Sequence, residues 1–241
     1  MIMQPSPNFN DRPDGVRIKY LILHYTGMAT GQAALKRLCD KASKVSAHYM
    51  IEEDGRIFVL VPESRRAWHA GVSAWGDDQD INGLSIGIEL VNPGHDSPGY
   101  KGDYRPFPEA QMTALITLCR GILSRHDIRP WYILGHSDIA PARKSDPGEL
   151  FDWQRMAEAG IGVWPLAVVI SQAGKSQADK CDEDVFRQRL AQYGYDIGAG
   201  EGMKAAIIAF QRHFRPADIS GVIDGQCCSI LENLLTMKNA T

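Results

Sequence analysis

Two histidines in this sequence follow short apolar runs, at points where the chain turns polar. His24 ends one run, and His136 follows another after a single glycine. Apolar runs of this length, bounded by glycine and polar residues, are typical of buried strands. The loop after His136 also carries Lys144 and Asp146, and side chains two residues apart in an extended segment point the same way. An imidazole pair, an ammonium and a carboxylate are therefore expected to converge at one end of a sheet.

The set His24, His136 and Asp146 predicts a metal site. Three protein ligands with a fourth position left for water are the pattern of a catalytic zinc site. With two neutral imidazoles and one carboxylate the centre stays positive, so it can polarise a carbonyl and lower the pKa of bound water. The alternative is that each histidine merely ends a strand, and these residues alone leave both interpretations open. On the first interpretation we expect one Zn²⁺ per chain.

A carboxylate interrupts another apolar run, residues 85–92. Burying Glu89 in such a strand costs free energy unless the carboxylate has a partner or a function. The alternative is a glutamate on an edge strand that faces water.

Residues 65–83 form a connection rich in Trp, His and Gly, and such loops often carry binding groups.

The composition indicates an ordinary globular protein. The chain has 241 residues, of which 44% are hydrophobic and 23% are charged, with a formal net charge of -3. This charge argues against nucleic acid or an anionic membrane as the main partner. No apolar run approaches the length of a membrane span. Residues 1–14 lack the pattern of a signal peptide, so we expect a cytoplasmic protein, or one of the periplasm or cell envelope if a leader was removed. We expect a monomer.

The periodicities predict an α/β fold with a mixed central sheet flanked by helices, followed by a small all-α domain. Strands are expected at 18–23, 47–51, 57–61, 85–92 and 131–134, with the second and third forming a hairpin. Helices are expected from Thr30, from Pro108 and over 150–159, while residues 1–17 are expected to be an irregular arm. The predicted domains are residues 1–165 (catalytic), 166–180 (linker) and 181–241 (three helices, the last capped by Asp224).

Five motifs, taken in order, resemble those of the zinc-dependent N-acetylmuramoyl-L-alanine amidases, a family shared with phage lysozyme-type amidases and peptidoglycan recognition proteins. They are residues 22–26, Ser46-Ala47-His48-Tyr49, Ala67-Trp68-His69-Ala70-Gly71, residues 85–89 and residues 135–148. The two-domain order resembles that of AmiD-type bacterial enzymes, because residues 209–216 and 221–224 are similar to a three-helix peptidoglycan-binding module.

The resemblance implies roles for individual residues. Zinc ligands fall on His24, His136 and Asp146, the catalytic carboxylate on Glu89 and the catalytic lysine on Lys144. Phage members carry a catalytic tyrosine where this chain has an alanine before its second histidine, so the base role would rest on the glutamate. Candidates for holding sugar or peptide are His48, Trp68, His69 and Asn92.

The implied function is hydrolysis of the amide bond between N-acetylmuramic acid and L-alanine, in peptidoglycan or in muropeptides. The alternative is a recognition protein that keeps the groove without catalysis, although the intact set of implied site residues favours the enzyme. A serine or cysteine hydrolase is disfavoured because no Gly-x-Ser-x-Gly motif is present and no cysteine lies near a motif histidine. The C-terminal part has six Lys and Arg against eight Asp and Glu. We expect it to bind wall without relying on charge and to be separable near Gly174, or alternatively to pack on the catalytic part as structure.

Overall fold

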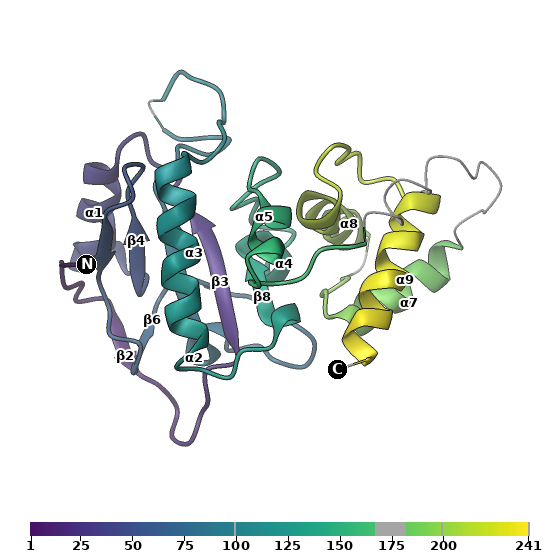
Figure 1. Cartoon of the computed structure of the whole chain (residues 1–241), viewed down its shortest axis with the longest axis horizontal. Coiled ribbons are helices and arrows are strands. Elements are labelled where there is room, and N and C mark those ends of the chain that lie inside the picture. The colour runs from purple at the N-terminus through teal and green to yellow at the C-terminus, as the bar shows by residue number, and fades with distance from the viewer. Residues whose placement is uncertain (99, 167–181, 199, 241) are drawn as a thin grey trace.

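The computed structural model describes residues 1–98, 100–166, 182–198 and 200–240 (Figure 1). Within these residues, six strands form a mixed sheet in the order β1-β5-β4-β7-β3-β8. In this sheet only β4 and β5 pair antiparallel, which confirms the predicted hairpin. The strands are β1 (Ile2–Met3), β5 (Ile57–Val59), β4 (Tyr49–Ile51), β7 (Ser85–Leu90), β3 (Tyr20–Tyr25) and β8 (Ile133–Gly135).

The N-terminal arm is more regular than predicted. Its first residues form β1, which pairs parallel with β5. Strand β2 (Phe9–Asp11) pairs antiparallel with β6 (Arg65–Ala67). The expectation of an irregular arm is wrong for these two segments, because such short strands take their conformation from tertiary pairing rather than from their own pattern.

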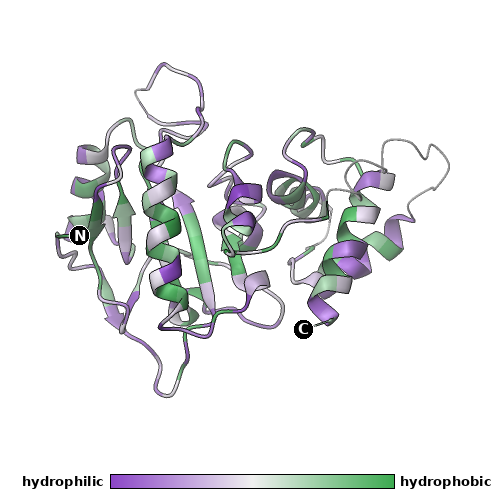
Figure 2. Cartoon of the chain, in the orientation of Figure 1, coloured by the Kyte–Doolittle hydropathy of each residue, from purple (hydrophilic) through white to green (hydrophobic). Residues whose placement is uncertain are grey.

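Alternation along β3 divides the core between the two faces of the sheet. Leu21 and Leu23 belong to the cluster under α3 (Glu109–Leu123), while Tyr20 and Ile22 belong to a different cluster on the opposite face. Figure 2 shows the apolar residues of α3 as a stripe along the helix. Farther along the opposite face, α1 (Gly31–Cys39) packs on Met50 of β4. His24 continues the series of Tyr20 and Ile22 and therefore lies on this opposite face.

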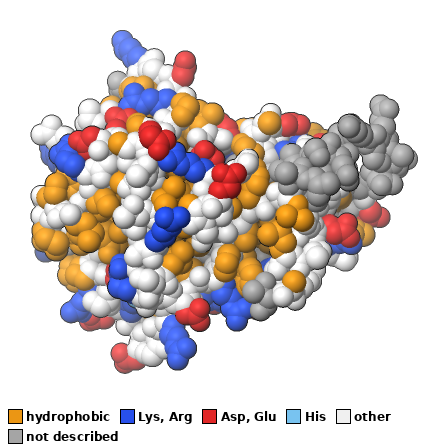
Figure 3. Space-filling model, in the orientation of Figure 1, with side chains coloured by type: hydrophobic (Ala, Val, Ile, Leu, Met, Phe, Trp, Pro, Cys, Tyr) orange, Lys and Arg blue, Asp and Glu red, His pale blue; other side chains and the backbone are white. Residues whose placement is uncertain are grey.

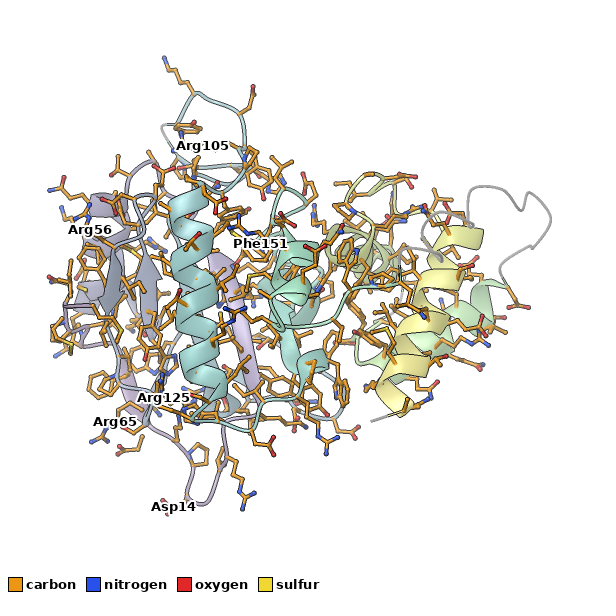
Figure 4. The ribbon with its side chains drawn as sticks, in the orientation of Figure 1. Asp14, Arg56, Arg65, Arg105, Arg125 and Phe151 are labelled. Carbon is orange, nitrogen blue, oxygen red and sulfur yellow. The ribbon has the colours of Figure 1, made fainter. Side chains whose placement is uncertain are left out.

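Several helix boundaries follow from local signals. The hydroxyl of Thr30 accepts a hydrogen bond from the Ala33 backbone N–H and so caps α1, and α3 begins directly after Pro108. The expected helix over 150–159 is shorter, α5 (Trp153–Glu158), and α2 (Ile81–Leu84) precedes β7. The loop predicted after β8 instead starts with a short helix, α4 (His136–Ile139). Phe151, which precedes α5 (Figure 4), packs edge-on against Phe107 in the same hydrophobic cluster as the buried residues of α3.

In the described part of the chain after residue 181, three helices form a C-terminal module, as predicted. They are α7 (Glu183–Tyr193), α8 (Glu201–Phe214) and α9 (Gly225–Asn239), and the side chain of Asp224 caps the last one. The predicted linker 166–180 lies outside the described residues apart from Leu166. No helix in the described ranges is long and apolar enough to cross a membrane.

The C-terminal module shares a hydrophobic core with the sheet. One continuous cluster joins Tyr20, Ile22 and Trp75 to Phe186 and Phe210 of the module. The backbone N–H of Gly76 also donates to the carbonyl of Gly194, at 2.7 Å. A side chain at Gly194 would meet the Trp75 ring, with 2.4 Å between a Cβ and the nearest ring atom, so glycine allows this close approach. The module therefore covers the part of the sheet that α1 leaves open.

Candidate active site

The strand register brings three of the predicted site residues to one edge of the sheet. His24 and Glu89 are direct partners on the parallel strands β3 and β7, so their side chains lie on the same face. Strand β8 ends at Gly135, which pairs with Leu23, so His136 follows at the same level on the other side of His24. In sheets with parallel strands, sites commonly form at the carboxyl ends of those strands.

Three ligand atoms face one another at this edge. His24 Nδ1, His136 Nδ1 and Asp146 Oδ2 lie 3.0 Å apart in each of the three pairs. All three side chains are buried, and together they form a group able to hold a metal ion. The sequence-based grouping of these residues is thus confirmed as a geometric cluster.

Hydrogen bonds on the side of each ligand imidazole that faces away from the cluster determine which ring nitrogen is unprotonated. His136 Nε2 lies 3.0 Å from the Ala70 carbonyl oxygen, which can only accept, so Nε2 carries the proton and Nδ1 does not. Behind His24, the Ser85 hydroxyl donates to the Ile81 carbonyl at 2.5 Å and accepts from His69 Nε2 at 3.1 Å. His69 Nδ1 then accepts from His24 Nε2 at 3.0 Å.

These hydrogen bonds leave a bare lone pair on Nδ1 of both ligand histidines, directed at a carboxylate oxygen. Burial, with a further contribution from His136, lowers the pKa of His24 to about 4, so its ring is neutral. Three facing acceptors without a shared proton repel one another unless a cation lies between them. The donor set of two imidazoles and one carboxylate fits zinc.

Glu89 and Lys144 line the same cavity as His136 and Asp146, a space of about 370 Å³. Burial, and secondarily the charge of Asp146, raises the pKa of Glu89 well above its usual range, while Lys144 opposes this shift. Within the described ranges, Glu89 Oε2 is buried without a hydrogen-bond partner. A carboxyl group of this kind suits proton transfer more than structure.

The four candidate substrate contacts divide into two pairs. Trp68 and His69 line the cavity. His48 is fully buried: its Nδ1 accepts from the Gly87 N–H and its Nε2 lies 3.0 Å from the Arg65 carbonyl. Asn92 is also fully buried and bonded to the backbone of residues 94 and 105. This geometry argues against direct substrate contact by His48 and Asn92, because neither reaches the cavity.

Sequence reasoning missed Tyr25 and Ser85. Tyr25 lines the cavity, and its hydroxyl lies 3.1 Å from both His95 Nδ1 and Ser145 Oγ. Its position next to His24 at the strand end was the only available signal. The position of Ser85 in the chain offered no such signal, because its role is to accept a hydrogen bond from His69, sixteen positions earlier.

Comparison with known proteins agrees with this geometry. Residues 14–149 match the N-acetylmuramoyl-L-alanine amidase family. This chain belongs to that family. It is 41% identical to N-acetylmuramoyl-L-alanine amidase AmiD of Escherichia coli over 231 residues, which cover 91% of this chain and 83% of that protein. It is 34% identical to the E. coli 1,6-anhydro-N-acetylmuramyl-L-alanine amidase AmpD over 168 residues, which cover 63% of this chain and 87% of that protein.

Two solved structures of amidases have the same fold over nearly the whole chain. E. coli AmiD in complex with anhydro-N-acetylmuramic acid-L-Ala-D-γ-Glu-L-Lys superposes with a TM-score of 0.83 at 38% identity, covering 95% of this chain and 98% of that one. Pseudomonas aeruginosa AmpDh3 with an anhydromuramic pentapeptide gives a TM-score of 0.83 at 35% identity, covering 94% of each chain. The present chain is therefore an amidase that hydrolyses the bond between N-acetylmuramic acid and L-alanine.

Proposed function

We propose that this amidase holds Zn²⁺ between His24, His136 and Asp146 and uses Glu89 and Lys144 as its catalytic side chains. The observation that carries the proposal is the set of three lone-pair-bearing atoms, each 3.0 Å from the other two. Two of these ligands, His136 and Asp146, line the same cavity as Glu89, whose Oε2 is buried and has no hydrogen-bond partner in the described residues. Bound zinc would polarise the amide carbonyl and lower the pKa of water.

Glu89 moves the proton in this proposal. Its carboxylate takes a proton from the water that adds to the carbonyl carbon, and the carboxyl group then returns it to the nitrogen. The carbon–nitrogen bond breaks, and L-alanine leaves as a neutral amine. A pKa raised by burial suits a group that must first accept and then donate near neutral pH. Lys144 places a positive charge beside the carbonyl oxygen, which becomes negative as water adds.

We infer that soluble muropeptides are substrates alongside polymeric wall. The solved relatives from E. coli and P. aeruginosa carry anhydromuramic peptides. The cavity has the size of a small-molecule site and opens beside the half-buried Trp68, whose indole can pack on a sugar ring. On the face shown in Figure 3, basic and acidic side chains are interspersed, so recognition would rest on hydrogen bonds and apolar contacts rather than on one sign of charge.

The test is an assay on a soluble anhydromuropeptide and on purified sacculi, with products identified by mass spectrometry. We expect a free peptide that begins with L-alanine, and about one zinc per purified chain by elemental analysis. His136→Ala should lose both zinc and activity. A wild-type chain that binds the muropeptide without cleaving it, even when zinc is supplied, would instead identify a recognition protein.

A further inference from the structure

The segment 136–149 carries two of the three ligands and Lys144, and helix α8 of the C-terminal module contacts it near both ends. α8 packs against α4, the short helix that begins with His136 (Figure 1). Two consecutive residues of α8, Arg212 and His213, reach opposite ends of the segment. The hydrolysis described above assigns no role to either residue.

Asp138, two residues after a ligand, is the first of these contact points. Its carboxylate is fully buried and accepts three hydrogen bonds. The Gly135 N–H donates at 2.7 Å, which fixes the turn from β8 into α4. The other two donors come from the module: the Tyr195 hydroxyl at 2.6 Å and His213 Nδ1 at 2.8 Å. Two of the three partners of this buried charge therefore belong to the C-terminal module.

The His213 ring is itself held in place. It stacks on Trp153 of α5, with ring centroids 3.8 Å apart and an interplanar angle of 19°, and on Phe214 at 3.9 Å and 8°. Packing on both sides leaves the imidazole little freedom to turn its Nδ1 away from Asp138. The contact is thus a fixed link between α8, α5 and α4.

Glu149, three residues after the ligand Asp146, is the second contact point. Its carboxylate forms an ion pair with Arg212 Nε at 3.4 Å and lies 3.0 Å from His95 Nε2. The other nitrogen of His95 lies 3.1 Å from the Tyr25 hydroxyl, which lines the active-site cavity. The two ends of the segment are also joined to each other, because the Ser137 N–H donates to the Asp146 carbonyl at 2.8 Å.

We propose that the C-terminal module is a positioning element of the active site, in which Tyr195 and His213 hold Asp138 and thereby keep His136 and Asp146 in metal-binding geometry. The inference rests on the metal assignment of the proposed function. A buried carboxylate that loses a donor is left unsatisfied, which costs far more than losing a surface contact. A shift of α4 that lets this carboxylate reach water would carry His136 with it and displace that ring from its partners.

The test compares two tyrosines of the module. Tyr195→Phe removes a hydroxyl that donates to Asp138, whereas Tyr193→Phe removes a buried hydroxyl that has no hydrogen-bond partner in the described part of the chain. We expect Tyr195→Phe to release zinc to a chelator about five- to tenfold faster than wild type, as one hydrogen bond to a charged group allows. We also expect its kcat on a soluble muropeptide to fall at unchanged KM. Tyr193→Phe should match wild type in both measurements.

A second pair of variants separates the donor from the ring. His213→Phe keeps the stacking on Trp153 but loses the donor, while His213→Asn loses the ring but keeps an N–H near the Nδ1 position. Faster zinc release in His213→Phe, with partial rescue in His213→Asn, supports positioning. Release rates in Tyr195→Phe and His213→Phe equal to that of Tyr193→Phe would overturn it. A wild-type chain that holds no zinc would contradict the metal assignment instead, so the two failures are distinguishable.

Discussion

At the scale of single residues, the site depends on which atoms carry protons. The ligand histidines expose bare Nδ1 atoms because their Nε2 protons are committed to Ala70 and His69. A short series of hydrogen bonds, ending at backbone carbonyls that cannot donate, thus prepares two rings for a cation. Glu89, the proposed catalytic carboxylate, lies beside His24 on the neighbouring strand.

Glu89→Gln should separate proton transfer from metal binding. The substitution is nearly isosteric, and the three ligands are untouched, so zinc content should remain at the wild-type level. The rate should fall by about 10²–10⁴, the usual contribution of a general base. Steady-state kinetics on a soluble muropeptide, with zinc measured on the same sample, checks this. A variant with near wild-type turnover would remove Glu89 from the mechanism.

His69 is expected to act on the metal site through His24 rather than through the sugar. His69→Phe keeps the buried ring but removes the acceptor for His24 Nε2–H, so zinc affinity should fall by about 10–100-fold, the usual effect of losing such a partner. Competition with a chromophoric chelator measures this loss. Ser85→Ala removes the hydroxyl that accepts a hydrogen bond from His69, and it should lower zinc affinity by a smaller factor. Unchanged zinc affinity with a raised KM would return His69 to its sequence-based role as a substrate contact.

At the scale of elements, the sequence predicted what depends on local pattern. Apolar runs that end in histidine indicated the strands and the sheet end where they meet. Strand burial and side-chain periodicity can be recognised from residues that are neighbours in the sequence. The strands of the N-terminal arm were missed, since their pairing partners lie more than fifty positions away. The partners of Asp138 were equally hidden: Tyr195 and His213 are 57 and 75 positions distant, and only the folded chain brings them together.

The end of α3 is tied to the sheet by Glu63. Its carboxylate lies 2.8 Å from His126 Nε2 and accepts hydrogen bonds from Tyr49 and Arg125, the last of which lies near one end of α3 in Figure 4. Burial would raise its pKa, but these hydrogen bonds outweigh burial and lower the pKa of Glu63 to about 2. The contact is therefore expected to stabilise the fold only while the carboxylate is charged.

The sign of the pH dependence follows from this depressed pKa. The stabilisation is fully present above the pKa of about 4.5 expected for the unfolded chain and is lost as the pH falls toward 2. Glu63→Gln should lower the free energy of unfolding by roughly 1–2 kcal/mol at neutral pH, allowing for screening of the half-exposed Arg125. The difference from wild type should shrink below pH 4. Urea denaturation at several pH values tests this, and a difference that is constant with pH would contradict it.

At the scale of the whole molecule, the C-terminal module packs on the face of the sheet opposite α3. Its helices share one core with β3 and with Trp75, and they supply two of the donors to Asp138. The resemblance of residues 209–216 and 221–224 to a peptidoglycan-binding module favoured wall binding, and the polar stretch before them favoured a separable module. The polarity of a connecting segment does not indicate whether the elements on either side of it pack together. In this protein the described helices of the module pack against the sheet. Binding to wall by this module stays a prediction.

The packing changes what we expect of a truncated chain. A protein ending at Leu166 would expose the apolar side chains of Tyr20, Ile22 and Trp75 and would leave Asp138 with only its Gly135 donor. Each large side chain returned to water costs about 1.5–3 kcal/mol, so the truncated chain should melt at least 10 °C lower and lose zinc more readily. Its rates on soluble muropeptide and on sacculi should therefore fall together. Differential scanning calorimetry and the pair of rates measure this. Full activity on the soluble substrate with loss only of sedimentation with sacculi would mean that the module is a separable wall-binding domain after all.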